Sequence, residues 1–113
     1  MTETLFEKII KKDIPADVIY EDEKSIVIKD INPQAPIHLL IIPKKNITML
    51  SSADEEDKEI LGHLMLVAGK VSKILKLDNT FNIVINNGAN AGQTVFHLHL
   101  HLLSGKSLNW LPT

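Results

Sequence analysis

Three histidines near the end of the chain, His97, His99 and His101, alternate with leucines. Successive side chains of a β-strand point to opposite faces, so this spacing would place the three imidazoles on one face. The opposite face is predicted to be apolar and to consist of Phe96, Leu98, Leu100 and Leu102. A neutral imidazole can act as a nucleophile, as a base or as a metal ligand. The alternating segment is therefore the first candidate for a chemical site.

A loop rich in glycine and asparagine, residues 87–94, leads directly into the histidine segment. Gly88 and Gly92 allow backbone amides to approach an anion closely, and Gln93 and Thr94 offer side-chain donors. Joined to the histidines, this loop favours phosphate chemistry, in which one imidazole attacks phosphorus while others hold and neutralise its oxygens.

The histidines fit two other interpretations. One is a solvated polar strand face without any chemistry. The other is a zinc site, because alternating histidines on a strand are suitable ligands. The remaining ligands would then have to be His38 and Asp30, since the chain has no cysteine. The adjoining loop favours phosphate chemistry over both interpretations, so no metal is expected.

The composition indicates one globular domain that spans residues 1–113. Hydrophobic residues make up 44% of the chain and charged residues 23%, and the net charge is -2. This charge argues against the basic surface of a duplex nucleic-acid binder. No apolar run approaches the length of a membrane span, and the first residues do not resemble a signal peptide. We therefore expect a cytoplasmic protein, also nuclear if the source is eukaryotic, without membrane or nucleic-acid partners.

Periodicity and turn residues predict an α+β fold with a mainly antiparallel sheet. Thr4 and Glu7 have the spacing of a capping box, which begins a short helix that ends before Pro15. Runs of β-branched residues predict strands, and one nearly continuous apolar run predicts a buried central strand. In chain order, the expected elements are a helix over 5–11, strands over 18–20, 25–28 and 38–42, a helix from Ser52 or Asp54 to about Leu77, and strands over 80–86 and 96–102.

The long predicted helix has apolar residues at helical spacing along one side. These residues are Ile60, Leu61, Leu64, Val67, Ala68, Val71, Ile74 and Leu75. Met65 and Leu66 lie off this stripe. They are expected either to form exposed apolar surface or to contact a second subunit, and the sequence favours neither.

The segment His97-Leu98-His99-Leu100-His101-Leu102-Leu103 resembles the signature of the histidine-triad (HIT) nucleotide-binding superfamily. Further segments between residues 4 and 112 resemble the Hint branch of this superfamily. They are Phe6-Glu7-Lys8-Ile9-Ile10, Asp30-Ile31-Asn32-Pro33-Gln34-Ala35-Pro36, His38, Ile42-Pro43-Lys44-Lys45, Leu61-Gly62-His63-Leu64-Met65, Asn86, Gly92-Gln93-Thr94-Val95 and Trp110.

The resemblance implies a HIT-like fold, in which a five-stranded sheet with one long and one short helix dimerises into a ten-stranded sheet. It implies a purine nucleoside phosphoramidase, which hydrolyses the P–N bond joining AMP or GMP to an amine through a covalent nucleotidyl-histidine. The implied partners are a purine nucleotide and a second copy of the chain, and no cofactor is required. His101, where the transferase branch carries glutamine, favours hydrolysis over nucleotidyl transfer.

The resemblance also implies catalytic roles. His99 would be the nucleophile, and His38 would join the histidine network. His97 and His101 would flank the phosphate. The Thr94 hydroxyl would help to protonate the departing amine.

A second group of residues is implied to bind the nucleotide. Asp30 would bind the ribose hydroxyls beside Ile31, and Trp110 would reach toward the partner subunit's site. The base pocket would be lined by Leu5, Phe6, Ile9, Ile28 and Leu40, and the phosphate side by Asn86, Gly92, Gln93 and Thr94.

Two alternative functions remain open. The first is dinucleoside polyphosphate hydrolysis, as in the Fhit branch, which shares the triad and the Gly92-Gln93-Thr94-Val95 segment. The Pro33-Gln34-Ala35-Pro36 loop and Trp110 favour the Hint branch. The second is a nucleotide-binding interaction protein whose slow catalysis is incidental.

Overall fold

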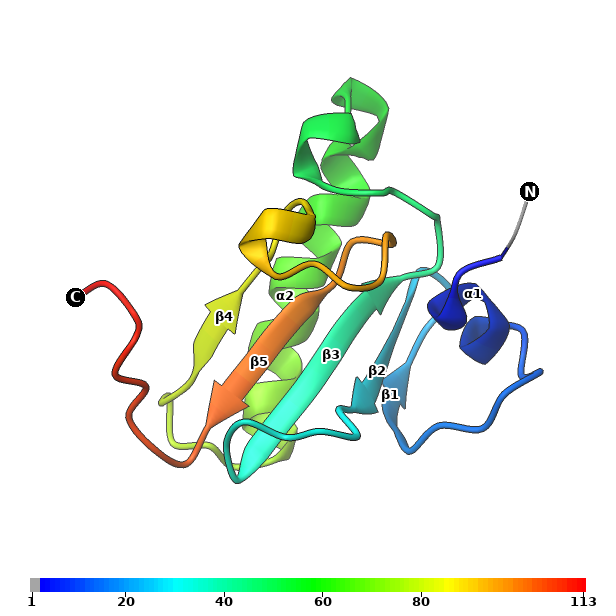
Figure 1. The fold of residues 1–113 in the computed structure, drawn as a ribbon. Coiled ribbons are helices and arrows are strands. Elements are labelled where there is room, and N and C mark those ends of the chain that lie inside the picture. The colour runs from blue at the N-terminus through cyan, green and yellow to red at the C-terminus, as the bar shows by residue number, and fades with distance from the viewer. Residues whose placement is uncertain (1–2) are drawn as a thin grey trace.

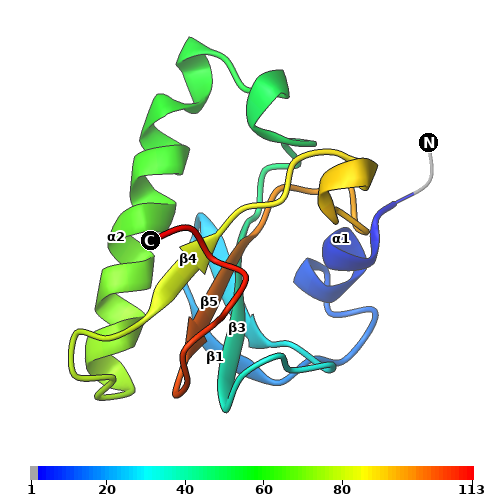
Figure 2. The ribbon, with the colours of Figure 1, turned by 60° about the vertical axis from the view of Figure 1, so that its left-hand side comes forward.

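The computed structural model describes residues 3–113, which form a five-stranded antiparallel sheet between two helices (Figure 1). The strands are β1 (Val18–Glu21), β2 (Ser25–Lys29), β3 (Ile37–Pro43), β4 (Asn82–Val84) and β5 (Leu100–Ser104), and the helices are α1 (Leu5–Ile10) and α2 (Lys58–Ile74). The strand order across the sheet is β1-β2-β3-β5-β4. The long helix α2 covers one face, and the short helix α1 lies on the other side of the sheet (Figure 2). The predicted α+β architecture is confirmed.

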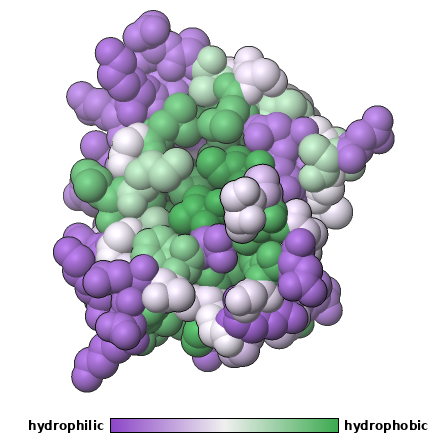
Figure 3. All heavy atoms as spheres, turned by 90° about the vertical axis from the view of Figure 1, so that its left-hand side faces the viewer, coloured by the Kyte–Doolittle hydropathy of each residue, from purple (hydrophilic) through white to green (hydrophobic). Residues whose placement is uncertain are grey.

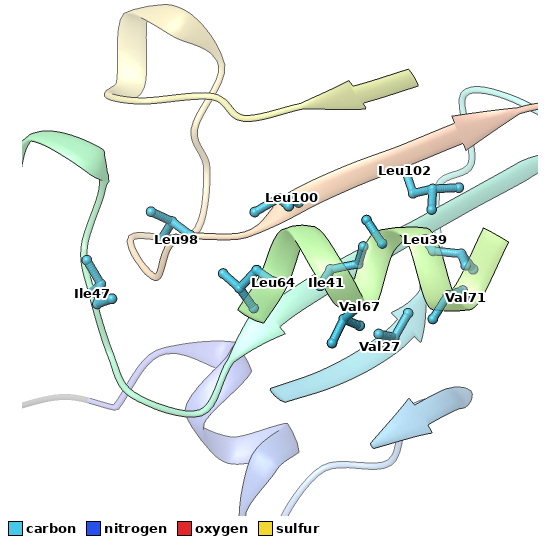
Figure 4. Packing of buried hydrophobic residues seen from close by; sticks show 11 residues of the cluster. Val27, Leu39, Ile41, Ile47, Leu64, Val67, Val71, Leu98, Leu100 and Leu102 are labelled. Atoms are coloured by element: carbon cyan, nitrogen blue, oxygen red, sulfur yellow. The ribbon is translucent and has the colours of Figure 1, made fainter. Parts of the chain in front are cut away.

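The central strand β3 is buried on both faces, as its continuous apolar sequence predicted. The core between the sheet and α2 consists of Val27, Leu39, Ile41, Ile47, Leu64, Val67, Ala68, Val71, Leu98, Leu100 and Leu102 (Figure 4). The smaller core on the α1 side consists of Phe6, Ile9, Ile26, Ile28, Leu40 and Ile42. Because side chains alternate along a strand, the residues between those facing α2 point to the α1 side. That side is where a cavity forms.

Thr4 and Glu7 make the predicted capping box at the start of α1. Thr4 Oγ1 accepts the Glu7 amide at 3.1 Å, and Glu7 Oε1 accepts the Thr4 amide at 2.9 Å. Phe6 and Ile9 of the same helix are buried against the sheet. The cap and these two anchors together hold α1 over β2 and β3.

Helix α2 begins later than predicted, at Lys58. Two 3-10 turns, Leu50–Ser52 and Glu55–Asp57, precede it. Asp54 caps the second turn, its carboxylate accepting a backbone amide of that turn at 2.9 Å. Neither predicted residue caps α2 itself, whose N-cap is Asp57: Asp54 caps the 3-10 turn that leads into the helix, and Ser52 lies inside the first turn.

Helix α2 also ends earlier than predicted, at Ile74. Lys76 has a φ of 56°, and the Leu77 amide donates to the Ser72 carbonyl at 3.0 Å. This Schellman motif turns the chain out of the helix. Ile74 itself is 55% exposed, so its predicted place in the buried stripe is wrong. In the last turn of α2, the side chain that packs into the core is that of Val71.

The predicted histidine strand differs most from the structure. Strand β5 starts only at Leu100, so two of the three histidines lie in irregular chain before it. The ladder with β3 does not extend further, because Pro43 has no amide to donate. The Leu98 amide donates instead to the Ile47 carbonyl at 2.6 Å. Phe96 is 41% exposed and does not join the apolar face to which the sequence assigned it.

Strand β4 is shorter than the strand predicted over 80–86 and forms one edge of the sheet. The segment that leads into β4 is held by Ser104 of β5, whose hydroxyl donates to the Thr80 carbonyl at 2.6 Å. Among residues 3–113, no helix is both long enough and apolar enough to cross a membrane.

Candidate functional site

A cavity of about 560 Å³ opens between α1 and the sheet face beneath it. Its walls consist of Leu5, Phe6, Ile9, Ile14, Pro15, Ala16, Asp17, Ile28, Lys29, Asp30, Ile31, Asn32, Leu40, Thr94, Val95, His99 and His101. The volume lies in the range of small-molecule sites, and a mostly apolar lining with a few polar groups is typical of them. The polar residues of the wall include Asp30, His99 and His101.

Most of the predicted nucleotide-binding residues line this cavity. They are Leu5, Phe6, Ile9, Ile28, Asp30, Ile31, Leu40, Thr94, His99 and His101. The sequence did not point to the other wall residues, which are Ile14, Pro15, Ala16, Asp17, Lys29, Asn32 and Val95. Asn32 and Val95 belong to segments that resemble the Hint branch but were given no role there, and Lys29 is the sequence neighbour of Asp30.

His97 does not line the cavity, and its side chain is completely buried. Its Nε2 lies 2.7 Å from the Pro43 carbonyl, and its Nδ1 lies 3.3 Å from Thr4 Oγ1. Because a carbonyl can only accept, Nε2 carries the ring proton and Nδ1 accepts from the Thr4 hydroxyl. Both ring nitrogens are therefore used within the fold. This placement does not support the predicted position of His97 beside a phosphate.

His99 lines the cavity and keeps one ring nitrogen available. Its Nδ1 lies 2.8 Å from the His97 carbonyl, so Nδ1 carries the proton and Nε2 has a lone pair. Among the described residues, every fully buried side-chain polar atom has a hydrogen-bond partner. His99 Nε2 has no partner among them, so it is not fully buried, and it is open to the cavity that the ring lines. The Phe6 ring stands edge-on to the imidazole with centroids 4.9 Å apart and limits its rotation.

His101 obtains its orientation from His38 on the neighbouring strand. The Gln34 amide donates to His38 Nδ1 at 3.0 Å, so neutral His38 carries its proton on Nε2. That Nε2 lies 2.9 Å from His101 Nδ1 and 3.3 Å from an Asp30 oxygen. Donation to Nδ1 leaves the proton of neutral His101 on Nε2, on a ring that lines the cavity. One backbone amide thereby sets the tautomers of two rings.

Burial keeps all four histidines neutral. It lowers the pKa of His38, of His97 and of His99. Burial, together with the neighbouring His99 and His38, lowers the pKa of His101 to about 4. At neutral pH the cavity therefore offers one imidazole lone pair, on His99, beside one imidazole N–H, on His101. The centroids of these two rings are 5.0 Å apart.

The loop before the histidines is held together by Gln93. This side chain is buried, accepts the Gly88 amide at 2.8 Å, and donates to the carbonyls of Thr48 and Val95. These bonds use both ends of the side-chain amide, so Gln93 is not the free donor to a phosphate that the sequence suggested. Gly92 has a φ of 97°, a conformation that favours glycine.

Other predicted residues lie outside the cavity walls. Asn86 and Gly92 pack on each other, since a Cβ at Gly92 would lie 3.4 Å from the Asn86 side-chain nitrogen. Trp110 is 62% exposed in the C-terminal tail. Thr94, by contrast, is exposed at the cavity wall, where its hydroxyl is accessible to a ligand.

The comparison with protein families agrees with this geometry. The HIT domain matches residues 11–108 of the chain. The chain belongs to the HIT domain family. A relative at 51% identity over 111 residues is the 14 kDa zinc-binding protein of Zea mays; the match covers 96% of this chain and 87% of that protein.

Solved HIT structures share the fold over nearly the whole chain. A HIT family hydrolase from Legionella pneumophila superposes with a TM-score of 0.92 at 40% identity, covering 98% of this chain and 100% of that chain. A histidine triad nucleotide-binding protein from Candida albicans superposes with a TM-score of 0.82 at 35% identity, covering 98% and 85% of the two chains.

The name of the maize protein raises the question of a metal. Asp30, His38 and His101 form a group whose ligand atoms lie within 4.8 Å of one another. His38 would have to bind through Nε2, because its Nδ1 accepts the Gln34 amide. Neutral His38 would then have to carry its proton on Nδ1, where it would face another N–H donor. The residues in this arrangement therefore do not fit a zinc ion.

Proposed function

We propose that the chain hydrolyses the P–N bond of purine nucleoside phosphoramidates, with His99 as the nucleophile. The observation that carries this proposal is Nε2 of His99, which has no hydrogen-bond partner among the described residues and opens to the cavity beside the N–H of His101. Nucleophilic catalysis requires such a lone pair, and a donor beside it can neutralise charge on the phosphoryl oxygens. The Legionella relative is named a hydrolase and the Candida relative a nucleotide-binding protein, which supports this reaction class.

The reaction proceeds in two displacements at phosphorus. His99 Nε2 attacks first, so that an N–P bond forms while the P–N bond of the substrate breaks. The amine leaves with the electron pair of that bond and takes a proton, which the Thr94 hydroxyl delivers and regains from water. A second water then attacks phosphorus, the bond to His99 breaks with its electron pair returning to Nε2, and the water proton is released.

The remaining walls bind the nucleoside. The apolar side chains of α1, β2 and β3 form a slot for the flat base, lined by Leu5, Phe6, Ile9, Ile28 and Leu40. Asp30 accepts hydrogen bonds from the ribose hydroxyls, since an ionised carboxylate offers several acceptor positions. The Asn86–Gly92 contact and Gln93 support the loop on the phosphate side. No step uses a metal or a cofactor.

A fluorogenic adenosine phosphoramidate tests the proposal. We expect His99→Ala to lower kcat by at least about 10³-fold, because nucleophile loss disables the whole catalytic unit. His63→Ala is the matched control and should keep wild-type turnover, because His63 belongs to α2 on the opposite side of the sheet. A chelator should also leave turnover unchanged.

Other outcomes of this assay point elsewhere. Equal turnover of wild type and His99→Ala would remove the proposed nucleophile. Faster turnover of a diadenosine polyphosphate would identify a dinucleoside polyphosphate hydrolase. Nucleotide binding with negligible turnover of either substrate would identify a nucleotide-binding interaction protein.

We propose also that the partner is a second copy of the chain, bound through β4 and the outer side of α2. Strand β4 is an edge strand, so one side of its backbone is free to pair. The molecule shows a broad hydrophobic area on the face that carries this edge (Figure 3). On the outer side of α2, Leu66 is 75% exposed.

Two glycines on that side of α2 support the same partner. Gly62 and Gly69 lie at helical spacing from Leu66, and no atom lies within 4 Å of a Cβ built on either. Each costs the helix roughly 0.5–1 kcal/mol relative to alanine, and no packing contact within residues 3–113 requires a glycine at either position. Close approach of a second helix would use the space that both leave.

The mass in solution tests this interface. We expect a dimer for wild type by sedimentation equilibrium, and a monomer for Leu66→Glu. Ser51→Glu, an equal charge change at an exposed position outside α2, should remain dimeric. A wild-type monomer would contradict the proposal.

A further inference from the structure

We propose that Thr4, the residue that caps α1, is a positioning residue for His99 and acts through His97. The proposal rests on the proposed function, in which His99 is the nucleophile. Thr4 lies outside the cavity walls. The sequence predicted only that Thr4 caps α1 and gave it no part in catalysis.

The Thr4 hydroxyl makes two contacts at once. Its oxygen accepts the Glu7 amide at 3.1 Å, which is the helix cap, and lies 3.3 Å from His97 Nδ1. A hydroxyl has one proton to donate and two lone pairs to accept with, so both bonds are compatible. The same oxygen therefore caps the N-terminal end of α1 and contacts His97, the first histidine of the triad.

The direction of the second bond follows from the other side of the His97 ring. Nε2 of His97 lies 2.7 Å from the Pro43 carbonyl and must donate to it. Nδ1 of this neutral ring is then an acceptor, and within residues 3–113 the proton that reaches it is that of the Thr4 hydroxyl. The ring is completely buried, so water does not replace that donor.

The link continues from His97 to His99 by two routes. The His97 carbonyl accepts Nδ1–H of His99 at 2.8 Å and thereby aims the free Nε2. The Phe6 ring of α1 packs edge-on against both imidazoles, with centroids 5.9 Å from His97 and 4.9 Å from His99. A change at the N-terminal end of α1 therefore reaches the nucleophile through a hydrogen bond and through an aromatic contact.

Three substitutions separate the contact with His97 from helix capping. Thr4→Ser keeps the cap and the hydroxyl proton. Thr4→Val loses both and keeps the shape. Thr4→Asp caps the helix as well as threonine, but an ionised carboxylate has no proton to donate to a neutral Nδ1.

We expect Thr4→Ser to retain wild-type kcat, and Thr4→Val and Thr4→Asp each to lower kcat about tenfold with a smaller change in KM, because a slightly misplaced nucleophile slows the chemical step. Wild-type kcat in Thr4→Asp would overturn the proposal, since the hydroxyl would then act only as a cap. Wild-type kcat in Thr4→Val would overturn it as well.

Imidazole ¹⁵N chemical shifts of the ligand-free protein test the same link without any turnover. We expect the His97 and His99 ring signals to shift in Thr4→Val and Thr4→Asp and to stay in place in Thr4→Ser. Unchanged His99 signals in both Thr4→Val and Thr4→Asp would overturn the proposal. If His99→Ala keeps full turnover, the proposed function fails on that assay alone, whereas these spectra still decide whether Thr4 positions the ring.

Discussion

Two histidine–aspartate pairs lie on opposite sides of the sheet, and they are used differently. At the cavity, His38 Nε2 lies 3.3 Å from Asp30 Oδ2. Between α2 and the β1–β2 turn, His63 Nε2 lies 2.8 Å from Asp22 Oδ2. The residue types are identical. What differs is how many of the carboxylate's acceptor positions the fold already occupies.

The Asp22 carboxylate is fully used by its surroundings. One oxygen accepts the amides of Lys24 and Ser25 and the Ser25 hydroxyl, and the other accepts from Tyr20 and His63. Burial alone would raise the pKa of the Asp22 carboxyl, but these hydrogen bonds outweigh it and hold the pKa well below its usual range. Such a carboxylate holds a turn together and has no acceptor left for a ligand.

The Asp30 carboxylate is only partly used. One oxygen accepts the Asn32 amide at 2.8 Å, while the other has only the longer contact to His38 and faces the cavity. A ligand with two adjacent hydroxyls can therefore still bind to it. The comparison shows that available acceptor positions, rather than the presence of a histidine–aspartate pair, separate a binding site from a structural one.

The largest expected effect is on the pH dependence of the free energy of unfolding, to which the two sides of the sheet contribute differently. In the unfolded chain an imidazole takes up a proton below about pH 6.5. In the folded chain burial lowers the pKa of four histidines, His38, His97, His99 and His101, and that of His101 falls to about 4. The unfolded chain then binds more protons, so the free energy of unfolding should fall as the pH drops from about 6.5 toward 4, by up to about 1.4 kcal/mol per pH unit for each buried ring.

Urea unfolding followed by circular dichroism between about pH 7 and pH 5 measures this slope. The stabilisation by Asp22 should persist over the same range, because a carboxyl with a lowered pKa loses its contribution only below its unfolded value of about 3.8. His101→Gln should reduce the slope. Unchanged stability across this range would show that the buried rings accept protons without cost.

The next effect is expected at the histidines of the two pairs. His38→Leu removes the donor that orients His101 and should lower kcat about 10²-fold, because a displaced catalytic group slows the reaction. His63→Leu should leave kcat unchanged, since His63 bonds to Asp22 of the β1–β2 turn and not to a residue of the cavity wall. Steady-state assays of the two folded variants measure this difference in kcat. An equal loss of kcat in both variants would contradict the assignment of the two pairs.

A smaller loss is expected at the cavity carboxylate. Asp30→Asn should lower kcat/KM about tenfold for a ribonucleoside phosphoramidate, because hydrogen bonds to a charged acceptor are stronger than those to an amide. With a 2′,3′-dideoxy substrate the wild type and the variant should turn over alike. A loss of the same size on both substrates would mean that Asp30 acts on the histidines rather than on the ribose.

The smallest effect is expected at the turn. Asp22→Asn should lower the free energy of unfolding by about 1 kcal/mol, since an amide has one acceptor oxygen where the carboxylate has two. Its kcat/KM should match that of wild type. A thermal melt together with the phosphoramidate assay measures both quantities, and a loss of activity in a stable Asp22→Asn variant would contradict the assignment.

Local patterns predicted much of the fold. The capping box of Thr4 and Glu7 and the continuous apolar run of β3 were sufficient to place two elements, because both depend on neighbours in the sequence. The histidine strand was predicted too long, since alternation alone does not show that Pro43 interrupts the ladder with β3. Long-range partners decide where a strand begins.

The sequence by itself determined that the chain is an α+β HIT domain, and it identified most residues of the cavity wall, including Asp30, His99 and His101. Only the tertiary structure decided which of the alternating histidines reach the cavity and which ring nitrogen carries each proton. The reason is physical: a tautomer follows from the donor or acceptor that faces each nitrogen. For His97 these partners are Thr4 and Pro43, which lie far from it along the chain.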